Sequence, residues 1–199
     1  AGPPSSGDWI VTGTESYSDQ TIVLNGSLIV ENGGDLTFRN VTLKLNCAYN
    51  GQYSIEVRSG GAFYVLESSI ITSVNSVNRY LFSVRQDSTF RMGDSELHYC
   101  GWDHWDGTGL YINSDDAVVE NSLISHNFYG IYVSSSGAVI RNNNITANQH
   151  GVTVGGDPQI YNNHISWNTV GISIAGGSPS IQNNTITSNP NAGVVIANS

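Results

Sequence analysis

Apolar residues recur in register along almost the whole chain, and this repetition constrains the fold more than any other feature. A first column advances by 27, 27, 27, 21, 20 and 21 residues and holds Phe38, Val65, Met92, Val119, Ile140, Ile160 and Ile181. A second column advances by the same steps and holds Leu43, Ile70, Leu97, Ile124, Ile145, Ile165 and Ile186. A third column consists of the apolar pairs Leu28/Val30, Ile55/Val57, Phe82/Val84, Leu110/Ile112, Ile131/Val133, Val152/Val154, Ile172/Ile174 and Val194/Ile196. Matched steps over this length are hard to obtain by chance, so every unit is expected to repeat one structure.

The residues around these columns alternate between apolar and polar, which is typical of short β-strands. Segments 130–133, 151–154 and 171–174 show the alternation clearly. A unit that repeats in register stacks on itself, so three short strands per coil form three parallel sheets. We therefore predict an all-β chain, a single parallel β-helix of about seven or eight coils, over residues 21–199. Residues 1–20 precede the repeat and form a possible cap.

Two polar columns accompany the apolar ones. The first lies three residues after the second apolar column and holds Asn46, Ser73, Cys100, Asn127, Asn148, Asn168 and Asn189. The second lies two residues after the first apolar column and holds Asn40, Glu67, Asp94, Asn121, Asn142, Asn162 and Asn183. Stacked asparagines can hydrogen-bond along a stack and to turn backbone, and Asn tolerates the left-handed conformation of sharp turns. We interpret these asparagines as structural.

The runs Ile-Arg-Asn-Asn-Asn-Ile-Thr-Ala-Asn at 140–148 and Ile-Tyr-Asn-Asn-His-Ile-Ser-Trp-Asn at 160–168 carry a family resemblance. They resemble the NosD-type right-handed β-helix repeat of the pectate-lyase-like superfamily, in its group of carbohydrate-binding and sugar-hydrolysis domains. The resemblance implies a right-handed coil. Its motif consists of turn and core residues, so it points to the fold and only weakly to a function.

The charge balance excludes some partners. The net charge is −9, with 16 acidic and only 7 basic residues, whereas a nucleic-acid surface needs clustered basic side chains. No stretch of about 18 apolar residues is present, so we expect no membrane insertion. The acidic, lysine-poor and Asn/Ser/Thr-rich sequence suits an extracellular or cell-surface protein.

The early repeats are longer than the late ones, and all of the extra length falls in one connection. These enlarged loops span residues 44–54, 71–81 and 98–109. Because coils stack, we expect the three loops to lie side by side on one face as a wall. Insertions on one face of a solenoid are common binding sites.

The third loop contains the densest chemical run of the chain, Cys-Gly-Trp-Asp-His-Trp-Asp at 100–106. Aromatic faces beside carboxylates suit a sugar ring, whose C–H face packs on aromatics while its hydroxyls take hydrogen bonds. The candidate ligand-binding residues are Arg79, Trp102, Asp103, His104, Trp105, Asp106, Tyr111 and Tyr132. In the alternative interpretation, the Trp-rich loop only covers its own coil.

We expect a non-catalytic module that binds a polysaccharide or glycan, or that serves as a scaffold. A polysaccharide-processing enzyme is the alternative, because glycoside hydrolysis uses two carboxylates and Asp103, Asp106 and Glu96 are candidates. A lyase-like reaction needs a strong base, and Arg79 is the one arginine of the three enlarged loops. The sequence shows no Ser-His-Asp arrangement. His126, His150 and His164 fall in different columns and are expected to be surface residues.

Metal binding is a further alternative, because NosD-like proteins are associated with copper delivery. The residues that raise it are His98, Cys100, Asp103, His104 and Asp106, but their spacing matches no standard closed site. Calcium could bind through Asp103, Asp106, Asp115 and Asp116. No cofactor is assigned with these residues.

Cys47 and Cys100 lie two coils apart, about 9.6 Å by the strand spacing, which is beyond disulfide reach unless the loops move. The last coil is as regular as the others and no cap follows it. We therefore expect either end-to-end self-association or further repeats of a longer chain.

Overall fold

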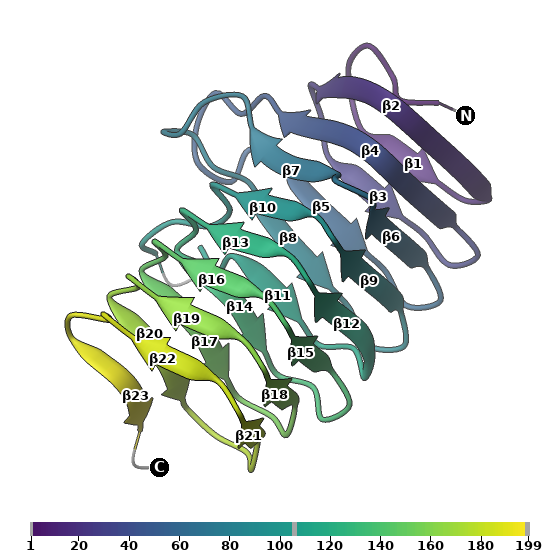
Figure 1. Ribbon diagram of the computed structural model, residues 1–199. Coiled ribbons are helices and arrows are strands. Elements are labelled where there is room, and N and C mark those ends of the chain that lie inside the picture. Colours follow the sequence, from purple (N-terminus) through teal and green to yellow (C-terminus); the bar gives the residue numbers. More distant parts are fainter. Residues whose placement is uncertain (1, 105–106, 198–199) are drawn as a thin grey trace.

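The computed structural model describes residues 2–104 and 107–197, whose regular elements are all β-strands. The chain winds so that each strand lies beside its equivalent in the next coil, which gives a long stack with the termini at opposite ends (Figure 1). Neighbouring strands pair in parallel, as the repeat predicts. The structure is a parallel β-helix.

One side of the stack is a sheet of nine strands. In spatial order these are β1 (Trp9–Val11), β3 (Leu28–Val30), β5 (Ser54–Val57), β8 (Leu81–Val84), β11 (Leu110–Ile112), β14 (Tyr129–Val133), β17 (His150–Val154), β20 (Val170–Ile174) and β23 (Ala192–Ile196). The apolar pairs of the third column face one another along this sheet, as expected.

The other strands form a bent sheet of fourteen strands. One arm holds β6 (Ala62–Leu66), β9 (Thr89–Gly93), β12 (Asp116–Glu120), β15 (Val139–Arg141), β18 (Gln159–Tyr161) and β21 (Ser180–Gln182). The other arm holds β7 (Ile70–Ser73), β10 (Glu96–His98), β13 (Leu123–Ser125), β16 (Asn144–Thr146), β19 (His164–Ser166) and β22 (Thr185–Thr187). The long strands β2 (Thr14–Leu24) and β4 (Asp35–Leu45) pair with each other, and β4 joins the two arms. The three expected strand stacks are therefore present, but hydrogen bonds connect two of them into one sheet.

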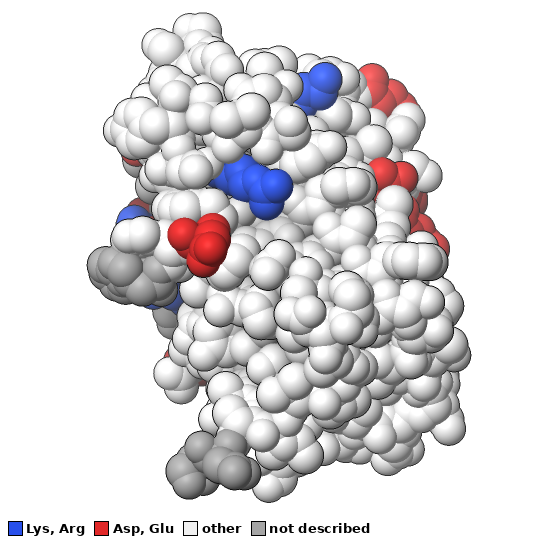
Figure 2. Space-filling view, turned by 90° about the vertical axis from the view of Figure 1, so that its left-hand side faces the viewer, with Lys and Arg blue, Asp and Glu red and all other residues white. Residues whose placement is uncertain are grey.

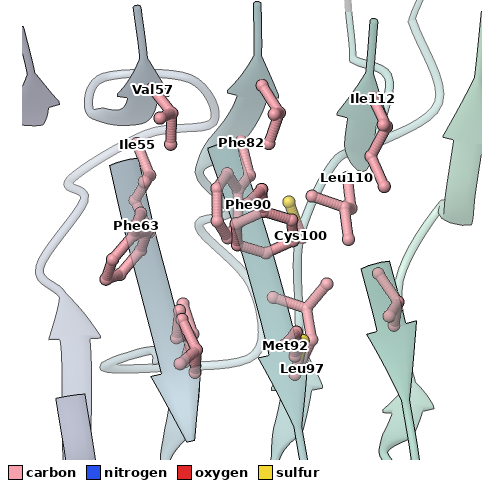
Figure 3. Close-up of a cluster of buried hydrophobic side chains, with 14 of the residues drawn as sticks. Ile55, Val57, Phe63, Phe82, Phe90, Met92, Leu97, Cys100, Leu110 and Ile112 are labelled. Carbon is pink, nitrogen blue, oxygen red and sulfur yellow. The ribbon is translucent and has the colours of Figure 1, made fainter. Parts of the chain in front are cut away.

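The interior is filled by the predicted apolar columns. Phe38 and Phe63 meet edge to face with their ring centroids 5.2 Å apart, and Phe82 and Phe90 do so at 5.3 Å. Figure 3 shows how side chains from neighbouring coils point into one shared core. Burial of these stacked apolar surfaces is the main favourable term for the fold.

The register corrects one member of the second column. Ile71, not Ile70, pairs with both Leu43 and Leu97 and is fully buried. The reason lies at the preceding corner, where Glu67 and Ser68 both adopt positive φ and add one residue to the turn.

Two internal ladders of polar side chains close the corners of the later coils. In the ladder predicted from Cys100 onward, the Oδ1 of each Asn accepts hydrogen bonds from the residue one coil earlier, for example Asn148 from Asn127. Asn46 is not part of it, because Asn46 is exposed and donates to Asn25 while Cys47 faces the interior.

The second ladder lies one residue after the column that the sequence suggested. Asn40, Asn121, Asn142, Asn162 and Asn183 are exposed and hold positive φ, which confirms their role in the turn. The internal ladder follows them and consists of the buried Asn143 and Asn163 and the partly buried Asn184, with Ser69, Ser95 and Ser122 in the earlier coils.

The two ends of the stack differ. Strands β1 and β2, which include much of residues 1–20, pair in register with β3 and β4, and Trp9 is buried against Tyr17 at 5.3 Å. In β23, Val194 and Ile196 expose 47% and 69% of their surface. End-to-end association or continuation into further repeats stays a prediction.

We expect Asn163→Ala to destabilise the protein by about 2–4 kcal/mol, because the buried Asn143 N–H loses its acceptor, and the Asn143 Nδ2 and the Ile140 carbonyl each lose a hydrogen bond. Asn162→Gly, next to it, should change stability by less than about 1 kcal/mol, because Gly accepts the left-handed conformation and the side chain is exposed. Urea unfolding of both variants measures the difference. Equal midpoints would show that the ladder does not stabilise the corner.

Candidate functional site

The enlarged connections run over residues 46–53, 74–80 and 99–109 and lie side by side (left in Figure 1). The Asn50 Oδ1 accepts from the Arg79 N–H at 2.8 Å, and the Arg79 carbonyl accepts from the Gly51 N–H at 2.8 Å. The Tyr80 carbonyl accepts from the Gly101 N–H at 2.9 Å. We call these three connections the wall.

Trp102 ties the third connection to the first. Gly51 has a φ of +76°, and a Cβ added there would lie 2.4 Å from the Cη2 of Trp102. The indole of Trp102 therefore rests directly on the backbone of Gly51, and it reaches across the wall instead of only covering its own coil.

A groove of about 540 Å³ opens where the wall meets the smaller coils. Its lining comes from both parts, namely Arg79, Trp102 and Asp103 of the wall, with His126, Asn127, Phe128, Ala147, Asn148, Gln149, Trp167 and Thr169. Figure 2 shows this side of the molecule, where few side chains are charged. The groove is therefore largely neutral, with one cation and one carboxylate among its described lining residues.

Arg79 is held in place at the groove. Its Nη1 donates to the Gly101 carbonyl at 3.2 Å, and its guanidinium carbon lies 5.8 Å from the centroid of the Tyr99 ring. Burial lowers the pKa of Arg79 from its ordinary value, but an arginine stays charged at neutral pH. It can donate hydrogen bonds to an oxygen-rich ligand.

The groove follows one corner of the coils, and residues in the left-handed conformation lie along it. These residues are Tyr99, His126, Ala147, Trp167 and Ser188, with φ of 55°, 60°, 56°, 58° and 55°. His126, Ala147 and Trp167 line the groove, and Trp167 exposes 71% of its surface. Each left-handed residue precedes a member of the first ladder, so the backbone sets its position.

The structure brings together three of the predicted binding residues, Arg79, Trp102 and Asp103. His104 is exposed in the same loop, where its N–H donates to the Trp102 carbonyl at 2.8 Å. Trp105 and Asp106 lie outside the described residues.

Tyr111 and Tyr132 lie on the nine-stranded sheet and are not among the groove lining. Their rings meet edge to face at 5.3 Å, and Tyr132 continues to Tyr129 at 5.8 Å and then to His150 at 4.9 Å. Burial, with Tyr132 and Asp103 nearby, raises the pKa of Tyr129, and burial lowers the pKa of His150. These rings form an aromatic row beside the groove.

Glu96, the third candidate carboxylate, lies on β10 and not among the lining of the groove. Its Oε2 is 2.8 Å from the Nε2 of His98, whose Nδ1 is 2.8 Å from the Oγ of Ser125. The Nδ1 of His126 is 3.0 Å from the same hydroxyl. A Glu-His-Ser row is therefore present, whereas no Ser-His-Asp arrangement could be recognised in the sequence.

The repeat spacing of the sequence is sufficient to predict this row. His98 and Ser125 are 27 residues apart, which is one full coil, and they pair across β10 and β13. Glu96 and His98 alternate onto the same face of their strand. Ser125 exposes only 3% of its surface, so its hydroxyl is not placed to attack a ligand. His126, expected to be only a surface residue, lines the groove.

The residues considered for metal binding are separated. Cys100 is buried in the core, whereas Asp103 and His104 are exposed. At the other end of β11, the Asp115 Oδ1 accepts from the Ser136 and Gly137 N–H groups, and Asp116 pairs with Arg91, which lowers the Asp116 pKa. Within residues 2–104 and 107–197, three or more metal-ligating side chains do not gather at one point.

The comparisons with known proteins bear on the fold. Residues 26–157 and 77–199 match the family described as right handed beta helix region. The chain belongs to this right-handed β-helix family. No curated protein and no solved structure matches it significantly. The described residues contain no helix capable of crossing a membrane.

We expect Gly51→Ala to destabilise this β-helix by about 1–2 kcal/mol or more, because Ala strains the left-handed backbone and its Cβ displaces Trp102. Thermal unfolding measures the loss, and Trp fluorescence reports the displaced indole. Gly13→Ala is the matched control, because a Cβ at Gly13 meets no atom within 4 Å. An unchanged unfolding temperature and spectrum in Gly51→Ala would contradict the packing.

Both cysteines are free and buried, and no bridge joins Cys47 to Cys100. Burial raises the pKa of both thiols, so the reactive thiolate fraction at pH 8 is lower than in an exposed thiol. We expect iodoacetamide to label the native protein at least about tenfold more slowly than the urea-unfolded chain, because both thiols are inaccessible to the reagent as well as less ionised. The alkylation rate of glutathione, measured in the same buffers, corrects for the effect of urea on the reaction itself. Equal rates would show that the thiols are accessible.

Proposed function

We propose that the groove binds carbohydrate, with an oligosaccharide lying along the stack against the corner that carries His126, Ala147 and Trp167. The chain would then be a binding module built on a right-handed β-helix. The NosD-type resemblance of the repeat is compatible with this role and names no ligand.

The choice of residues at the groove corner is the observation that carries the proposal. A left-handed backbone costs about 1–2 kcal/mol for an ordinary residue, and Asn or Gly adopts it more easily. At the corner between the two arms of the bent sheet, Asn holds this conformation in five coils. At the groove corner, Tyr99, His126 and Trp167 hold it instead. Strain retained where cheaper residues are available is a feature of functional sites.

The chemistry of the lining fits a sugar. Trp102, Phe128 and Trp167 offer apolar faces for the C–H surface of a pyranose ring. Asp103 and Gln149 can accept hydrogen bonds from hydroxyls, and the lining contains further donors for ring and hydroxyl oxygens. Such a mixture of apolar surface with a few polar groups is typical of small-ligand sites.

Hydrolysis is not part of the proposal. Glycosidases use two carboxyl groups about 5–9.5 Å apart. Among the described residues that line the groove, only Asp103 carries a carboxylate. A reducing-sugar assay on every glycan that binds tests this alternative directly. The extracellular or cell-surface location stays a prediction from composition.

Trp167→Asn separates binding from stability. Because Trp167 is 71% exposed and left-handed, we expect the variant to be as stable as the parent or up to about 1 kcal/mol more stable. It should lose up to about tenfold in glycan affinity, because packing of a sugar ring against an aromatic face contributes about 0.5–1.5 kcal/mol. A glycan array identifies the ligand, and calorimetry with urea unfolding measures both effects.

Asn162→Gly is the matched control, because it changes a left-handed residue at the opposite corner and should leave affinity unchanged. Binding that survives Trp167→Asn would place the ligand elsewhere. An array without any signal from cell-wall and host glycans would overturn the proposal.

A further inference from the structure

A row of hydrogen bonds runs from the bent sheet to the groove. It begins at Glu96, passes through His98 of β10 and Ser125 of β13, and ends at His126, which lines the groove. The three contacts measure 2.8, 2.8 and 3.0 Å between the heavy atoms. The stacking register fixes this row, because His98 and Ser125 are partners across adjacent strands.

The proton positions follow from what each group can donate. An ionised carboxylate only accepts, so the Nε2 of His98 must carry the hydrogen that reaches Glu96. In a neutral His98 the Nδ1 is then an acceptor, and the Ser125 hydroxyl donates to it. A hydroxyl has one hydrogen, so the contact between Ser125 and His126 must be donated by the Nδ1 of His126.

We propose that Glu96, His98 and Ser125 are positioning residues that hold His126 as its Nδ1–H tautomer. The Nε2 of His126 then carries a lone pair, and His126 serves the groove as a hydrogen-bond acceptor. This second step rests on the proposed function: the acceptor would select a ligand that presents a hydroxyl donor, as a sugar does, at the coil of His126.

The surroundings of His98 support a fixed arrangement. Its side chain is 16% exposed, and the titratable groups that face it are Glu96 on its own strand and Tyr99 and His126 at the corner. Arg79 lies over the other side of this cluster, with its guanidinium carbon 5.8 Å from the centroid of the Tyr99 ring. Among the described residues, Glu96 is thus the carboxylate that orients His98. Ser125 contacts both histidines and so connects the orientation of His98 to that of His126.

The tautomers can be measured without any ligand. Protein labelled with ¹⁵N-histidine at pH 8 gives two-bond ¹H–¹⁵N correlations that distinguish Nδ1–H from Nε2–H, and single His→Gln variants assign the five histidines. We expect Nε2–H for His98 and Nδ1–H for His126. In Ser125→Ala, His126 should shift toward the Nε2–H tautomer that free histidine prefers.

Ser166→Ala is the matched control. Ser166 occupies the same position of the repeat two coils later, is equally buried at 3%, and does not contact a histidine through any hydrogen bond of the described residues. Its variant should leave the His126 signals unchanged. Glu96→Gln provides a second test through a half-exposed side chain, because an amide can donate or accept; both His98 and His126 should then show mixed tautomers.

Three results would overturn the inference: an Nε2–H His126 in the parent protein, a doubly protonated His98 at pH 8, or His126 signals that do not respond to Ser125→Ala. The outcome is separate from that of the proposed function. If a glycan binds, Ser125→Ala should weaken it by about tenfold, equivalent to one hydrogen bond, while the Trp167 contact is kept. If no glycan binds but the tautomers are as expected, the row stands and the carbohydrate proposal fails.

Discussion

Two corners of each later coil depend on an asparagine side chain that completes hydrogen bonds the bent backbone cannot make. A residue with positive φ turns the chain, and the following Asn points inward, where its Oδ1 accepts from the previous coil and its Nδ2 donates to a strand carbonyl. Without these amides the corners would bury unpaired peptide groups, which is costly. In earlier coils Ser69, Ser95 and Ser122 meet part of the same need with hydroxyls.

This constraint also explains how the groove is built. The corner fixes the backbone, so the left-handed residue before each ladder amide has a defined position and a side chain that the core does not require. His126 and Trp167 use that freedom to line the groove, and the wall adds Arg79, Trp102 and Asp103 at one end. The hydrogen-bonded row from Glu96 reaches the same corner from the sheet. Fold and candidate site therefore share one repeated element.

The sequence predicts most of the fold because apolar columns report which residues face the core. It fails by one residue at Ile70, because column spacing cannot show whether a corner holds one left-handed residue or two. It also places the second ladder one residue early, because spacing alone cannot show which of two adjacent turn asparagines points inward. The wall could be predicted from loop length, and so could the presence of Trp102 and Asp103 there. The roles of His126 and Trp167 could not, because only the turn conformation shows that these residues leave the core ladder and line a surface.

The alternation of one structural amide with one unconstrained neighbour gives each coil one variable side-chain position at the corner that the groove follows. A substitution at that position changes one surface side chain and leaves the stack beneath it intact, because Tyr, His, Ala, Trp and Ser already occupy it in successive coils. The chemistry of this surface can therefore change coil by coil, at a fixed spacing, without a new loop or a new core.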